Sequence, residues 1–145
     1  MQPSDLKALA ERAKAAADSA YAPYSKFHVG AALLAADGRI FCAPNIENAS
    51  YGLGLCAETN AMMAAVTAGA KGFRALAVVG YRAEAPEEPV LATPCGRCRQ
   101  ILAEFCPPHL TVHIAPNSGG TPLTVTLADL LPHAFGPGAL GNADT

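Results

Sequence analysis

Three cysteines and one glutamate, in two short segments, have the types and spacing that a hydrolytic metal site needs. Glu58 follows Cys56 by two positions, and Cys95 and Cys98 form a Cys-x-x-Cys pair. Three thiolates can hold a zinc ion and leave its fourth position open, which a catalytic zinc requires and a structural zinc lacks. A carboxylate beside that position can move protons for a bound water molecule. The combination indicates hydrolysis at an electrophilic carbon.

The Cys-x-x-Cys pair by itself has three interpretations: a redox pair, a structural zinc site or a catalytic zinc site. Cys56 and Glu58 favour the catalytic one. A closed four-ligand site would need Cys42, Cys106 or a histidine. Cys106 lies eight positions beyond Cys98, at the far end of the same predicted helix. Cys42 lies in an apolar strand, where we expect a small buried side chain.

The elements that must position these residues follow from hydrophobic periodicity and turn signals. Helices are predicted from Asp5 to Ala20 with Ser4 as cap, from Cys56 to Ala68, from a Thr93 cap to Cys106, and near Leu127–Leu131. Strands are predicted over 27–34, 39–42, 74–79, 111–115 and 123–125, with a tight turn at 37–38. This order predicts a sheet with helices on its faces. Both cysteine segments then fall at helix N-termini, which favour thiolates.

Composition narrows the function further. The chain has 145 residues, of which 51% are hydrophobic, and a formal net charge of −2. We expect a single domain over 1–145, with a tail over about 133–145 that contacts other subunits and is disordered at its end. The absence of a basic cluster argues against nucleic acid as a partner. An odd cysteine count, no apolar leader and no membrane span predict a soluble cytoplasmic protein.

The chain resembles a known family along nearly its whole length. The motifs that carry the resemblance are Tyr21-Ala-Pro-Tyr-Ser, Phe27-x-Val-Gly-Ala-Ala-Leu, Asn45-Ile-Glu-Asn, Cys56-Ala-Glu, Pro94-Cys-Gly-Arg-Cys-Arg-Gln and Phe135-Gly-Pro. In this order they are similar to the small homotetrameric zinc-dependent cytidine deaminases of the cytidine/deoxycytidylate deaminase superfamily. The resemblance implies a three-layer α/β/α fold around a mixed sheet of about five strands.

The resemblance also implies an activity and a cofactor. Cys56, Cys95 and Cys98 would hold one Zn²⁺ per subunit. Zinc-bound hydroxide would attack C4 of cytidine or 2′-deoxycytidine while Glu58 shuttles protons, releasing ammonia in pyrimidine salvage. Glu58 is the expected catalytic residue, and the partner is a small nucleoside.

A nucleoside pocket is expected around Asn45 and Glu47, which face the same side of an extended segment. From the residues alone this segment reads as a solvated loop, and Phe27 reads as part of the core. The resemblance instead implies that Asn45 and Glu47 hold the ribose, that Phe27 stacks on the base, and that the backbone of Ala57 contacts the base.

Two further aromatic residues match family positions that reach the site from neighbouring subunits. They are Tyr51 and Phe135, the latter in a Gly- and Pro-rich tail with little core of its own to join. A homotetramer with sites completed by neighbouring subunits is therefore expected.

The chain departs from the family directly after Cys-Ala-Glu. Three thiolates on Zn²⁺ carry a net charge of −1, and many members place an arginine there to offset it. This sequence has Thr59. Compensation would then come from helix N-termini and from Arg99 or Arg97.

Other functions remain open at this level. A deaminase of the same fold could act on another aminopyrimidine nucleoside such as blasticidin S. A zinc-stabilised binding module without turnover is a different class, against which Glu58 and the open metal position argue. Nucleic-acid-editing relatives share the zinc motif, but this chain lacks a basic strand-binding surface.

Overall fold

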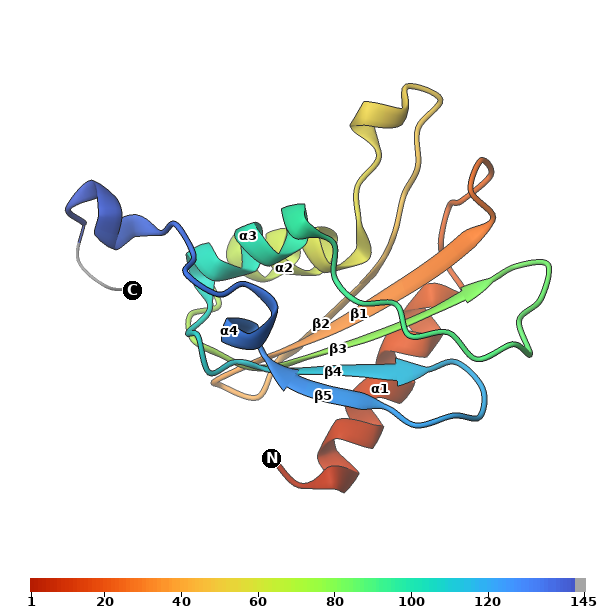
Figure 1. Ribbon diagram of the computed structural model, residues 1–145, viewed down its shortest axis with the longest axis horizontal. Helices are drawn as coiled ribbons and strands as arrows, with labels where there is room; N and C mark the ends of the chain where they lie inside the picture. Colours follow the sequence, from red (N-terminus) through yellow and green to blue (C-terminus); the bar gives the residue numbers. More distant parts are fainter. Residues whose placement is uncertain (143–145) are drawn as a thin grey trace.

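Five strands form one sheet: β1 (Phe27–Ala35), β2 (Ile40–Pro44), β3 (Phe73–Arg82), β4 (Thr111–Pro116) and β5 (Leu123–Thr126). The structure is a computed structural model that describes residues 1–142 (Figure 1). The strand order is β2-β1-β3-β4-β5. β3 and β4 run parallel, and the other neighbouring pairs run antiparallel. The predicted mixed sheet of five strands is confirmed.

The helical elements are α1 (Pro3–Ala17), α2 (Ala57–Thr67), α3 (Gly96–Phe105) and α4 (Leu127–Leu130), with short 3₁₀ turns η1 (Tyr51–Leu53) and η2 (Pro137–Leu140). α3 lies in the connection between the parallel strands β3 and β4, as a parallel crossover requires. Within residues 1–142, every helix is too short or too polar to cross a membrane.

Two hydrophobic cores lie on opposite faces of the sheet, because successive side chains of a strand point to opposite sides. On β3, Leu76 and Val78 join the core formed with α2 and α3, whereas Ala77 and Val79 join the core formed with α1. Figure 1 shows α1 on one side of the sheet and α2 with α3 on the other. The predicted three layers are confirmed.

The α1 layer packs unusually close to the sheet at Gly30. A methyl group at this position would overlap the carbonyl oxygen of Ala13 in α1. The apolar stripe of α1, at helical spacing, is buried along its length: Leu6, Leu9, Ala10, Ala13 and Ala17.

Two predicted helix caps are wrong. α1 begins at Pro3 after Gln2, whose backbone N–H donates to the Asp5 carboxylate at 3.0 Å, so Ser4 already lies inside the helix. α3 begins at Gly96 after Cys95, whose extended backbone makes it the N-cap in place of Thr93. Thr is the better intrinsic cap. In this fold, however, the backbone stays extended through Cys95, so the cysteine and not the threonine directly precedes α3.

Two segments extend away from the layers (Figure 1). One is the connection from β2 to α2 that contains η1, and the other is the tail after α4 that contains η2. Their exposed apolar side chains include Tyr51, Leu53, Phe135 and Leu140. The disorder predicted for the end of the chain concerns residues 143–145, which lie outside the described residues.

Candidate active site

The starts of α2 and α3 bring three thiols together. Cys56 and Cys95 are the N-cap residues of these helices, and Cys98 lies in the first turn of α3. The three sulfur atoms lie within 4.8 Å of one another, and those of Cys56 and Cys95 are 3.8 Å apart. Sulfur ligands at about 2.3 Å from a tetrahedral zinc are about 3.8 Å apart. The donor set therefore fits zinc in both chemistry and spacing.

Helix packing explains why the thiols meet. α2 and α3 lie on the same face of the sheet and contribute Met62 and Leu102 to one core. The free backbone N–H groups and the positive dipole end of each helix favour negative charge at its first turn. The fold thus places thiolate ligands at two anion-favouring positions.

A hydrogen bond between Cys56 and Cys98 shifts the pKa values of the two thiols in opposite directions. A hydrogen bond from Cys98 lowers the pKa of Cys56, against the opposing effects of burial and of Cys95. The same hydrogen bond, with burial and the charge of Glu58, raises the pKa of Cys98. Cys56 therefore ionises more readily than Cys98 in the metal-free chain, and metal binding requires both to lose their protons.

The remaining cysteines do not join the group. Within residues 1–142, the group of three or more possible ligand residues whose donor atoms all lie within 4.8 Å of one another consists of Cys56, Cys95 and Cys98. Cys106 is buried in the core beneath α2 and α3. Cys42, expected to be buried, is half-buried and packs against the α1 core. The described chain thus lacks a fourth protein ligand for a closed structural site.

Glu58 lies in the first turn of α2, with 4% of its surface exposed. Its Oε2 is 3.7 Å from the sulfur of Cys98. Burial raises the pKa of this carboxyl, outweighing the hydrogen bonds from its own backbone N–H and from Cys98 that lower it. A raised pKa makes a carboxyl better suited both to accept a proton and to return it.

Thr59 and the two arginines make different contacts around the thiols. The Thr59 hydroxyl oxygen is 3.2 Å from the Cys98 sulfur, and both residues are buried. Arg99 donates to the carbonyl oxygens of Pro94 and Leu130, each at 2.7 Å. Arg97 donates to the carbonyl oxygen of Gly54 at 3.4 Å. Of the predicted supporting residues, Thr59 contacts a sulfur, whereas both arginines contact backbone.

A pocket of about 340 Å³ extends from Cys56 along the β2–α2 connection. Its lining residues are Tyr24, Ser25, Asn45, Ile46, Glu47, Asn48, Tyr51, Gly54, Leu55 and Cys56. It thus contains three of the predicted nucleoside contacts and one thiol. Phe27, Ala57 and Phe135 do not line it.

Backbone pairing on both sides of Ile46 keeps the Asn45–Glu47 segment extended. Ile46 bridges to Tyr21 on one side and to Leu55 on the other. Asn45 and Glu47 therefore point to the same side, as predicted. The Asn45 amide accepts from the Val29 N–H and donates to the Phe27 carbonyl, each at 2.9 Å.

The Glu47 carboxylate is held by two backbone N–H groups of residues that were not among the predicted site residues. Its Oε1 accepts from the N–H groups of Tyr24 and Ser25 at 3.0 and 3.1 Å. Desolvation raises the pKa of Glu47, but hydrogen bonds from Ser25 and Tyr24 outweigh it, so the pKa lies below its usual value. Glu47 is therefore ionised at neutral pH. The Tyr-Ala-Pro-Tyr-Ser motif was the sequence signal for these donors.

Comparison with known proteins places the chain in a family. The family model of the cytidine and deoxycytidylate deaminase zinc-binding region matches residues 3–114, a range that includes Cys56, Cys95 and Cys98. This chain belongs to that family. A cytidine deaminase of Sporosarcina psychrophila is 47% identical over 131 residues, covering 90% of this chain and 91% of that protein. One from Mycobacterium tuberculosis is 41% identical over 134 residues, covering 91% and 90%.

Solved structures agree with the family assignment. A crystal structure of cytidine deaminase from Burkholderia pseudomallei has a TM-score of 0.81 and 46% identity, covering 93% of this chain and 100% of that one. The Mycobacterium tuberculosis cytidine deaminase structure has a TM-score of 0.76 and 42% identity, covering 91% and 98%. Zinc is thus the cofactor of this family, and the three-thiol group is placed to hold it.

The aromatic residues predicted to join the site belong to three different segments of this chain. Phe27 begins β1 and is half-buried. Tyr51 is 78% exposed on η1, and Phe135 is 62% exposed in the tail. Gln100 of α3 donates to the Phe135 carbonyl at 2.9 Å. Within one chain, Phe135 is thus largely exposed and does not line the pocket at Cys56.

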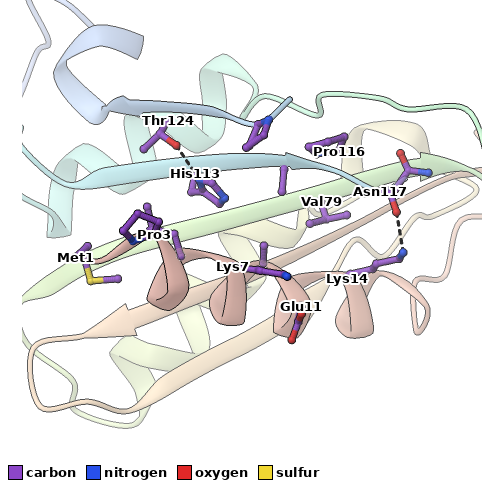
Figure 2. A pocket seen from close by; sticks show the side chains of 14 residues that line it. Met1, Pro3, Lys7, Glu11, Lys14, Val79, His113, Pro116, Asn117 and Thr124 are labelled. Atoms are coloured by element: carbon purple, nitrogen blue, oxygen red, sulfur yellow. Dashed lines mark hydrogen bonds between the residues drawn. The ribbon is translucent and has the colours of Figure 1, made fainter. Parts of the chain in front are cut away.

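A larger pocket, of about 550 Å³, lies on the opposite face of the sheet between α1 and β4 (Figure 2). Lys7, Glu11 and Lys14 line it from α1, and His113 lines it from β4. It contains none of the three grouped thiols. We therefore place the chemistry at the smaller pocket, which reaches Cys56.

Proposed function

We propose that this protein hydrolyses cytidine and 2′-deoxycytidine to uridine and 2′-deoxyuridine with release of ammonia. The observation that carries the proposal is the Glu58 carboxyl, buried 3.7 Å from one of three thiols at zinc-binding separation. Relatives named cytidine deaminase, 41–47% identical over about nine tenths of the chain, support the substrate class.

The proton transfers fall to Glu58. Zinc, when bound, would lower the pKa of a water molecule towards about 7 and so would supply a nucleophile at neutral pH. Glu58 takes up the proton that this water loses and delivers it to N3 of the cytosine ring. Once the oxygen of this water has bonded to C4, Glu58 takes the remaining proton of that hydroxyl group and delivers it to the amino group. The C4–N bond then breaks, ammonia leaves, and C4 becomes the carbonyl carbon of uridine. One carboxyl suffices because the two transfers are sequential.

The pocket at the β2–α2 connection supplies the nucleoside contacts in this proposal. Glu47, ionised and held by two backbone N–H groups, accepts a hydrogen bond from a ribose hydroxyl. Asn45 donates to the same sugar through its remaining N–H. Phe27 stacks on the base, and the backbone of Ala57 contacts it.

We further propose that the chain forms one domain and assembles as a homotetramer in the cytoplasm, in which neighbouring subunits complete each site. Tyr51 and Phe135 are the residues that would be contributed across subunits. Their exposure on two segments that project from the layers supports this assembly (Figure 1). A single chain gains little from holding aromatic rings in water.

The function is tested by changing the proton carrier without touching the thiols. Glu58→Gln should keep one zinc per chain and lower the turnover of cytidine, followed by ultraviolet absorbance, by about 100- to 10,000-fold. Glu104→Gln makes the same chemical change at an exposed position of α3 and should leave turnover unchanged. Wild-type turnover by a fully zinc-loaded Glu58→Gln variant would overturn the role of Glu58.

The same assay separates the alternatives. Blasticidin S, offered beside cytidine and deoxycytidine, should be turned over poorly if the Asn45 and Glu47 contacts select a ribose or deoxyribose. A chain that binds zinc fully and leaves all three compounds unchanged would be a zinc-stabilised binding module.

A further inference from the structure

The three thiolates carry negative charge that, among the described residues, no cationic side chain offsets by a hydrogen bond to sulfur. Three thiolates and Zn²⁺ sum to a net charge of −1, which hydrogen-bond donors around the sulfur atoms must stabilise. Among residues 1–142, no arginine or lysine donates to Cys56, Cys95 or Cys98. The two nearby arginines, Arg97 and Arg99, donate to carbonyl oxygens instead.

The side chain that does contact a ligand is Thr59. Its hydroxyl oxygen lies 3.2 Å from the sulfur of Cys98. Thr59 is 5% exposed and Cys98 is fully buried, so water does not compete for this contact. A thiolate has no hydrogen to give, so once Cys98 binds a metal the hydroxyl must be the donor. Such charge-assisted hydrogen bonds are about twice as strong as neutral ones.

The contact also joins the two elements that carry the ligands. Thr59 belongs to α2, which begins directly after Cys56, and Cys98 belongs to α3, which begins directly after Cys95. A β-branched side chain such as threonine has few χ1 rotamers in a helix, so its hydroxyl is held in place with little loss of entropy. The hydrogen bond therefore both stabilises the Cys98 thiolate and holds the ligands of α3 in register with that of α2.

We propose that Thr59 is a positioning residue of the zinc site. It donates a hydrogen bond to the Cys98 thiolate and raises the affinity for zinc at a site where no cationic side chain among residues 1–142 donates to the sulfur atoms. The inference rests on the proposed function for the assignment of zinc to these thiols. It adds the residue that holds the Cys98 ligand.

Thr59→Val tests the hydroxyl because valine keeps the branched shape and removes the donor. Competition with a chelator should show zinc affinity about 10- to 100-fold lower in this variant, the range typical for losing a hydrogen-bond partner of a metal ligand. Thr59→Ser restores the donor and should bring the affinity back to within about threefold of the wild type. Thr67→Val makes the same change at an exposed position of α2 and should have no effect.

A second readout reports on the sulfur itself. In the Co²⁺-substituted protein, the thiolate-to-cobalt charge-transfer absorption should shift in Thr59→Val and stay in place in Thr59→Ser, because the lost hydrogen bond changes the electron density on one sulfur. If the valine variant does not fold, Thr59→Ala provides the donor-free chain for both measurements.

The outcomes are separable from those of the proposed function. Unchanged zinc affinity and an unchanged cobalt spectrum in folded Thr59→Val would overturn the proposal. Equal losses in Thr59→Val and Thr59→Ser would also overturn it, because they would trace the effect to packing and not to the hydroxyl. Failure of the zinc-loaded wild type to deaminate cytidine would overturn the proposed function and leave the affinity comparison intact.

Discussion

The ring of Phe27 packs against the bare Cα of Gly80 on the neighbouring strand. A methyl group added to Gly80 would lie 3.1 Å from Cε1 of that ring and 2.7 Å from the methyl group of Ala92. Contacts this short cannot persist without movement of a neighbour. Gly80 therefore sets how far the Phe27 ring can settle onto the sheet, at the end of β1 that leads to the pocket.

We predict that Gly80→Ala displaces the Phe27 ring and raises KM for cytidine while zinc content stays at the wild-type level. Full loss of an aromatic stack on a base costs about 1–3 kcal/mol, which corresponds to a roughly 5- to 150-fold rise in KM. Gly80→Ala should cost part of this. In a Phe27→Leu background the same change should cost less, because the ring it displaces is already gone. Equal effects in both backgrounds would show that Gly80 acts elsewhere.

A second prediction concerns the sugar. Glu47→Ala should lower kcat/KM for cytidine by about 10- to 100-fold, since a hydrogen bond to a charged group contributes about 1.5–3 kcal/mol. If that bond is to the 3′-hydroxyl, which cytidine and 2′-deoxycytidine share, the loss should be much smaller for 3′-deoxycytidine, which lacks this group. The measurement is the ratio of kcat/KM for the two nucleosides in wild type and variant. Equal losses for both would mean that Glu47 only holds the Tyr24 and Ser25 backbone.

The sequence predicted that Cys56, Cys95 and Cys98 meet beside Glu58, because the determinants of this grouping are local. Cys-Ala-Glu and the Cys-x-x-Cys pair each sit at a helix start, and turn residues mark those starts. The N-cap at Cys95 was missed because intrinsic capping preference favours Thr93, whereas the fold leaves the cysteine extended. The sequence did not indicate that position 80 must lack a side chain. The Phe27 ring that fills this space is distant in sequence and becomes a neighbour of Gly80 only through β1–β3 pairing. The Thr59 contact likewise depends on how α2 and α3 pack.

A third prediction follows from His113 on β4 (Figure 2). Its side chain is 8% exposed, and its Nδ1 is 2.7 Å from the Thr124 hydroxyl. Burial lowers its pKa below the ordinary value of 6.5, so the unfolded chain takes up a proton at a higher pH than the folded chain. His113 should therefore reduce the free energy of unfolding as pH falls below about 6.5. At higher pH the histidine is neutral in both states and has no such effect.

The measurement is the urea midpoint at pH 7 and pH 5. His113→Asn should lose less stability between these two values than the wild type. His109→Asn changes an exposed histidine and should behave as the wild type does. An identical drop in wild type and His113→Asn would assign the acid sensitivity to other groups.

The last prediction concerns Phe135, which is 62% exposed in a tail that projects from the layers. We predict that this ring completes the site of a neighbouring subunit. The Phe135→Ser variant and the Glu58→Gln variant should then each have low deaminase activity when assembled alone. Assemblies that contain both variants should regain activity. With equal amounts mixed at random, about one quarter of the sites would combine an intact Glu58 with an intact Phe135 from a neighbour. Co-expression with two affinity tags isolates such mixtures for assay. A Phe135 ring that acts only in its own chain could not restore activity to a neighbouring subunit. Mixtures no more active than the average of the two variants would therefore show that Phe135 does not complete the site of a neighbour.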